Sequence, residues 1–108
     1  MTTAISRPLI AGFAGAVEQF ADEHEITEIV FAIYDIACRL FPMARTIRVA
    51  LGEDCEDSPW RHVDFLIEGL TISPRDAYGI DDRWTDEITP VCPVEHAWLF
   101  THDLKFAE

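Results

Sequence analysis

Hydrophobic residues recur with the period of a helix through the first forty residues of the chain. Ser6 and Pro8 are typical of a helix start, because a serine hydroxyl caps free amides and proline fits the first turn. Hydrophobic residues then recur every three or four positions to about residue 22: Leu9, Phe13, Val17 and Phe20. Gly12 and Gly15 interrupt this pattern, so either the helix is weak there or another backbone approaches it closely.

The segment from about Glu25 to Phe41 is predicted to be a second, stronger helix, which Pro42 ends. Its hydrophobic residues fall on two faces. One face carries Ile26, Ile29, Val30, Ile33, Ile36, Ala37 and Leu40, and the other carries Phe31, Tyr34, Cys38 and Phe41. A surface helix normally shows about half of its circumference to water. We therefore expect this helix to be covered by a sheet on one side, and by the first helix or a second copy of the chain on the other.

After Pro42 the hydrophobic residues recur at every second position, which is typical of strands. One strand is predicted around Ile47, Val49 and Leu51, and another from Arg61 to Gly69. The acidic loop 52–59 separates them. We expect the two strands to form an antiparallel hairpin across that loop.

The C-terminal third is predicted to contain less regular structure. Ser73 and Pro74 are typical of a helix start, a further helical turn carries Trp84, and a last strand runs from about Glu95 to Ala107. Together the elements predict a single α+β domain over residues 1–108. Its two N-terminal helices pack on one face of a small antiparallel sheet of at least three strands, with a short irregular helical connection before the last strand.

The sheet face that points away from the helices is expected to mix charged and hydrophobic residues. Alternation assigns to it Arg48, His62, Asp64, Glu68, Asp103 and Lys105. Trp60 and Leu66 share the same parity. Apolar residues on an outward face indicate a second contact surface.

Composition narrows the range of partners. The 108 residues hold 8 Lys and Arg against 20 Asp and Glu, a formal net charge of −12. This balance opposes binding to nucleic acid or anionic lipid, since both rely on basic side chains that neutralise phosphates. No run of about 18 apolar residues occurs, so no membrane span is predicted. A basic protein partner fits the charge, and so does an acidic surface that only keeps the chain in solution.

Three widely spaced cysteines, Cys38, Cys55 and Cys92, suggest neither a disulfide framework nor a closed zinc site. We therefore expect a reduced, cytoplasmic protein. No glycine-rich phosphate loop or other common catalytic motif occurs, and we expect no cofactor.

His62 and Asp64 are the first candidate site, because alternation puts both side chains on one side of a strand, about 7 Å apart. Such a pair serves as two metal ligands or as a base with its orienting acid. A solvated sheet face, with Arg48 and Lys105 as neighbours, explains the same pattern.

Two further histidines lie near the C-terminus. His96 follows Cys92 by four residues, which suits a nucleophile or a metal site, although a cysteine between prolines is commonly just buried. His102 shares the parity of Phe100 and Leu104 and should face the core. If one histidine lines a pocket under the helices, we expect it to be His102.

Two acidic clusters complete the candidates. The loop Glu53 to Asp57 holds four carboxylates, but it lacks the spacing of a calcium loop. The second cluster surrounds Trp84 and comprises Asp81, Asp82, Asp86 and Glu87. Either Trp84 is exposed within a docking surface for a basic partner, or it packs inward with Ile80 and Ile88.

The sequence alone thus favours a non-enzymatic protein-interaction or regulatory module that acts as a homodimer. The residues expected to contact a partner are Phe31, Tyr34, Phe41, Trp60, Leu66 and Trp84. The alternative is a small metal-binding domain or enzyme that uses His62 and Asp64 with His96 or His102.

Overall fold

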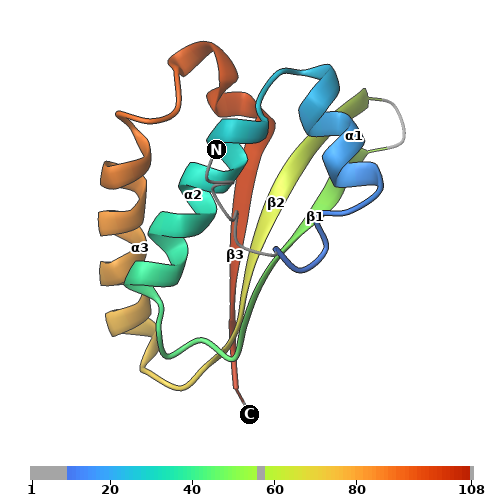
Figure 1. The fold of residues 1–108 in the computed structure, drawn as a ribbon. Coiled ribbons are helices and arrows are strands. Elements are labelled where there is room, and N and C mark those ends of the chain that lie inside the picture. Colours follow the sequence, from blue (N-terminus) through green and yellow to red (C-terminus); the bar gives the residue numbers. More distant parts are fainter. Residues whose placement is uncertain (1–9, 56–57, 108) are drawn as a thin grey trace, which may run out of the picture.

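Three helices, a three-stranded sheet and a short 3-10 helix make up the described part of the chain (Figure 1). The structure is a computed structural model. It describes the backbone of residues 10–55 and 58–107, and the side chains of these residues except those in the range 53–60. The elements are α1 (Ala16–Glu23), α2 (Thr27–Leu40), β1 (Thr46–Cys55), β2 (Ser58–Leu70), α3 (Pro74–Ile88), η1 (Val94–Leu99) and β3 (Phe100–Phe106). The predicted α+β class, with two helices before the strands, is confirmed.

The sheet has the order β1-β2-β3, with β2 in the centre. β1 and β2 form the expected antiparallel hairpin, in which Ile47 lies opposite Ile67. β3 pairs with β2 in parallel, so the sheet is mixed rather than antiparallel throughout. The segment that connects β2 to β3 explains the parallel pairing. A full helix of 15 residues, α3, takes the place of the irregular turns we expected, and it returns the chain to the starting end of β2.

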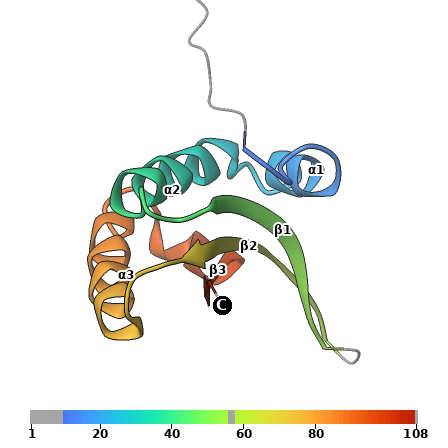
Figure 2. The same ribbon diagram turned by 90° about the horizontal axis from the view of Figure 1, so that it is seen from below.

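The helices lie on one side of the sheet (Figure 2). The strand residues on that side form the core with them, including Val49, Val63, Phe65 and Ile67. On the opposite face the side chains are mainly polar, and Arg48 Nε lies 2.6 Å from Glu68 Oε1. This open face carries the residues that alternation assigned to it.

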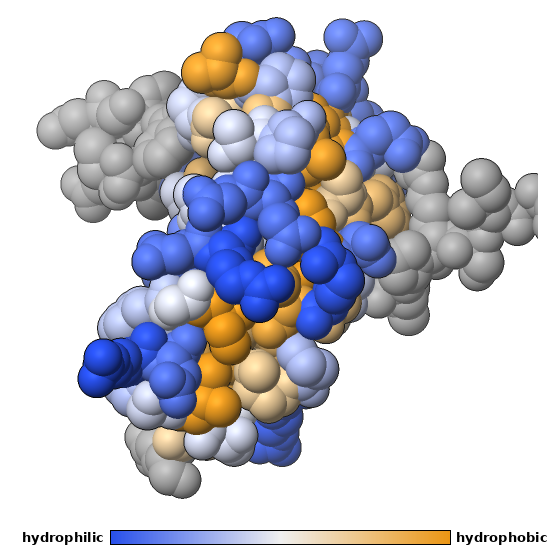
Figure 3. All heavy atoms as spheres, turned by 90° about the vertical axis from the view of Figure 1, so that its left-hand side faces the viewer, coloured by the Kyte–Doolittle hydropathy of each residue, from blue (hydrophilic) through white to orange (hydrophobic). Residues whose placement is uncertain are grey.

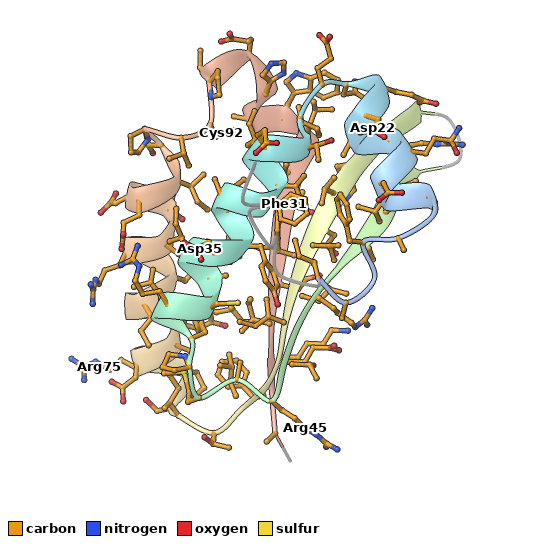
Figure 4. The ribbon with its side chains drawn as sticks, in the orientation of Figure 1. Asp22, Phe31, Asp35, Arg45, Arg75 and Cys92 are labelled. Atoms are coloured by element: carbon orange, nitrogen blue, oxygen red, sulfur yellow. The ribbon has the colours of Figure 1, made fainter. Side chains whose placement is uncertain are left out.

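Helix α2 is covered on two sides, and both covers come from this chain. On one side the ring of Phe31 packs edge-on against Phe13 at 5.1 Å (Figure 4). On the other side α3 packs beside α2, where Phe41 and Trp84 meet edge-on at 5.8 Å. A second copy of the chain is therefore not needed to bury the second apolar face.

This packing buries three of the six residues expected to contact a partner. Phe41 and Trp84 are each 1% exposed, and Leu66 is buried on the open face. Phe31 and Tyr34 are half-buried against the core. The side chain of Trp60 lies outside the described part of the structure. Of the two alternatives for Trp84, an exposed docking residue or a core residue, the structure shows the second, because the indole packs inward.

The described segment before α1 forms an isolated β-bridge and turns where we expected helix. Ala11 O accepts a hydrogen bond from Val49 N at 2.9 Å, which covers part of the outer edge of β1. Gly12 adopts φ +83°, and a Cβ there would lie 2.1 Å from Val49 O. Gly12 thus allows the close approach of another backbone, which was one of the two interpretations of the glycines in this segment. The expected helix start at Ser6 and Pro8 lies outside the described residues.

Candidate functional site

A cavity of about 380 Å³ lies between α3, η1 and the start of β3. Its walls come from five parts of the chain: Ile33 of α2, Phe65 of β2, Trp84, Thr85, Ile88 and Thr89 of α3, Cys92, Val94 and Ala97 of the connection, and Phe100, Thr101 and His102 of β3. A cavity of this size and lining is typical of ligand and side-chain binding sites.

The hydrogen-bond donors on the α3 wall are already engaged within the protein. Trp84 Nε1 donates to Ile33 O at 3.3 Å. The hydroxyls of Thr85 and Thr89 donate to backbone carbonyls one turn earlier, at 3.1 and 3.0 Å. This wall therefore offers little to a polar ligand, and burial of apolar surface is the interaction it supports best.

One acid–base pair stands at the cavity. His102 Nε2 lies 2.7 Å from Asp81 Oδ1, and the imidazole packs edge-on against Trp84 at 5.0 Å. A carboxylate in this position fixes the orientation of the imidazole. His102 thus lines a pocket under the helices, on the face that strand alternation assigned to it.

Sequence reasoning missed Asp81 as the partner of His102. The signal was present, since Asp81 precedes the buried Trp84 by three residues, and residues at that spacing share one face of a helix. The shared face of Asp81 and Trp84 can be inferred from the sequence only when residues 74–88 are taken as one continuous helix.

Cys92 also lines the cavity but is not an activated nucleophile. Burial, and after it the charge of Glu95, raises the pKa of the Cys92 thiol, so the sulfur is protonated at neutral pH. Its Sγ lies 3.7 Å from Pro93 O. Among the described residues, no hydrogen bond joins Cys92 to His96, which lies in η1.

The other predicted site residues are separated by the sheet. His62 and Asp64 lie on the open face, whereas His102 lies on the helix side. Asp64 Oδ1 accepts a hydrogen bond from Thr101 Oγ1 at 3.0 Å, and burial raises the pKa of the Asp64 carboxyl. The ring of His62 lies over Gly52, where a Cβ would be 2.3 Å from Nε2. Within residues 10–55 and 58–107, no group of three or more His, Cys, Asp or Glu is arranged to hold a metal ion.

Exposed hydrophobic residues gather in the segment that closes the cavity. Val94, which lines the cavity, is 85% exposed, Trp98 is 54% exposed, and Val91 is also exposed. Hydrophobic surface shows between charged residues along the α3 side of the molecule (Figure 3). The acidic cluster of α3 lies next to this surface, and Asp82 and Asp86 are exposed.

No family model, curated protein or solved structure matches this chain. In the part of the chain that the structure describes, no helix has the length and apolar character needed to cross a bilayer.

Proposed function

We propose that this chain is a protein-interaction module whose cavity receives an apolar side chain from a basic segment of a partner protein. The observation that carries the proposal is the apolar cavity, together with the exposed Val94 and Trp98 in the segment that closes it. The proposal is for binding rather than for a chemical step.

The exposed residues favour a protein over a small molecule as the occupant. A small ligand held inside the cavity would leave the outward surfaces of Val94 and Trp98 in water. A partner segment that crosses the opening would bury these surfaces as well as fill the cavity. Aromatic residues and a well-packed pocket are typical of the centre of protein interfaces.

The charge favours a basic partner. Helix α3 carries five acidic residues against two arginines, and the whole chain has a net charge of −12. Complementary charge increases association rates and excludes acidic competitors. Exposed carboxylates such as Asp82, Asp86 and Glu95 would supply that attraction beside the cavity.

Selection from a random peptide library displayed on phage tests the proposal directly. We expect the selected peptides to combine Lys or Arg with one aliphatic or aromatic anchor residue, and binding of the synthesised peptides to weaken with salt. Ala97→Trp fills the opening of the cavity and should abolish binding. Ala14→Trp adds the same ring at an exposed position before α1 and should leave binding unchanged.

Three results would count against the proposal. Selection could yield no binders, the selected peptides could lack basic residues, or Ala97→Trp could bind the peptides as tightly as the parent chain. Circular dichroism of both variants establishes that they are folded before binding is compared.

A further inference from the structure

The two outer edges of the sheet are covered to different extents. The outer edge of β1 is partly covered, since Ala11 pairs with it. β3 forms the opposite margin of the sheet (Figure 2), and within the described residues no strand pairs with its outer edge. An open edge presents backbone N–H and C=O groups to which another strand can add. β3 contains no proline and no glycine to discourage such pairing.

Side chains on both sides of β3 are poorly covered. On the helix side Leu104 and Phe106 are half-buried, and the neighbouring Tyr78 of α3 is 57% exposed, with its ring 6.4 Å from that of Phe106. On the open face Asp103 and Lys105 are exposed. The edge therefore offers hydrophobic contacts on one side and two opposite charges on the other.

The charges select one register for pairing with an identical strand. A two-fold axis perpendicular to the sheet pairs β3 with its copy in antiparallel fashion, and one residue then lies on the axis. With Leu104 on the axis, Asp103 lies opposite Lys105 of the second copy, and Lys105 lies opposite Asp103 of the second copy. With Asp103 or Lys105 on the axis, that residue faces its own copy, which is unfavourable.

We propose that the chain forms a homodimer through the outer edge of β3, with Leu104 on the two-fold axis and two Asp103–Lys105 pairs across it. The three strands of each copy join into one continuous six-stranded sheet. The pairing also places Phe106 opposite His102 of the second copy, beside the exposed Tyr78. The homodimer can be tested separately from the proposed function, because the charged residues that fix its register, Asp103 and Lys105, do not line the cavity.

Charge exchange tests the register. Asp103→Lys places lysines opposite each other, and Lys105→Asp places aspartates opposite each other, so each single variant should dimerise at least about tenfold more weakly than the parent chain. The double variant D103K/K105D restores both opposite-charge pairs and should dimerise like the parent. The two single variants, when mixed, should form a heterodimer, since every pair across the axis then has opposite charges.

Sedimentation velocity from about 1 to 100 µM at physiological salt measures these equilibria, because the long-range repulsion between two acidic chains is then largely screened. Asp35→Lys and Arg75→Asp are matched controls. They change the net charge by the same amounts on α2 and α3, and Arg75 points away from the sheet (Figure 4). Both controls should dimerise like the parent chain.

Each contrary result overturns the proposal. A parent chain that stays monomeric across the range has no such interface. Single variants that dimerise normally would place the contact elsewhere, and a double variant or a mixture that fails to associate would exclude this register. Amide hydrogen exchange of the parent chain gives a second measurement that needs no variant. Raising the concentration should protect β3 amides, and unchanged exchange there would also refute the interface.

Discussion

Replacing Trp84 by alanine should remove the contact that joins α3 to the rest of the core. The indole is 1% exposed and packs edge-on against Phe41 and Phe65, at 5.8 and 6.0 Å. Its Nε1 donates to Ile33 O on α2. Truncation of a buried tryptophan to alanine costs about 3–5 kcal/mol of unfolding free energy. That is a large part of the roughly 5–15 kcal/mol that stabilises a typical domain.

Urea denaturation followed by far-UV circular dichroism measures the effect. With a denaturant dependence of about 1.5 kcal/mol per molar, the midpoint should fall by about 2–3 M. Trp98→Ala is the matched control, because it deletes the same ring from a position that is 54% exposed. An exposed substitution of this kind changes stability by about 0.5 kcal/mol or less.

The comparison of the two variants decides whether Trp84 anchors the core. If Trp84→Ala and Trp98→Ala shift the midpoint equally, α3 is not held by the indole, and the packing of α3 against α2 described above is wrong. A loss of α3 helicity in Trp84→Ala, with the β1–β2 hairpin retained, would still agree with the reasoning.

Further predictions concern a pair of glycines, Asp64 and a pair of cysteines. Gly12→Ala should destabilise the chain by about 1–3 kcal/mol in thermal unfolding, because its backbone has positive φ and a Cβ would overlap a backbone oxygen. Gly79→Ala, in an open helical position, should instead stabilise it by about 0.5–1 kcal/mol. Asp64→Asn should raise the melting temperature at pH 7, and this gain should vanish below about pH 4, where the carboxyl is protonated in the unfolded chain as well. At pH 8, iodoacetamide should modify the exposed Cys38 before the buried Cys92, as peptide mass spectrometry would show.

The sign for Asp64 follows from the direction of its shift. Burial raises the pKa of the carboxyl in the folded state, so the folded chain binds this proton more tightly than the unfolded chain does. The stability that the proton contributes is complete at low pH and is lost as the pH rises through the folded pKa. A lower melting temperature for Asp64→Asn at pH 7 would contradict this account. Equal destabilisation by Gly12→Ala and Gly79→Ala, or equal alkylation of the two cysteines, would contradict the other two.

The elements with strong hydrophobic periodicity were predictable from the sequence. The helix expected from Glu25 to Phe41 is α2, Thr27–Leu40, and the strand expected from Arg61 to Gly69 lies within β2, Ser58–Leu70. In both segments the buried face is long and continuous, so local pattern and tertiary packing agree. The hairpin followed from the two strands and the polar loop between them.

The C-terminal third was harder because its pattern is diluted. Helix α3 buries only Ala77 and Trp84, and its many acidic residues hide the helical period. Without a continuous helix there was no reason to expect a parallel β3. The last strand also begins later than expected, since Val94–Leu99 forms a 3-10 helix after Pro93.

The candidate site shows the same division between local and long-range information. Strand alternation was enough to place His102 on the helix side. Its pairing with Asp81 depends on how α3 crosses the sheet, which no local pattern contains. The two apolar faces of α2 correctly required two covers, but periodicity does not reveal whether a cover comes from the same chain.

The central place of β2 has a consequence during synthesis. Its second neighbour, β3, is the last described element to leave the ribosome, and it reaches β2 only after α3 has formed. Until then one edge of β2 in the hairpin has unpaired backbone N–H and C=O groups. The same strand is rich in hydrophobic residues that are buried in the complete fold: Val63, Phe65, Leu66 and Ile67. Because exposed strand edges and hydrophobic surface favour aggregation, we expect the chain to be most prone to aggregate at this stage.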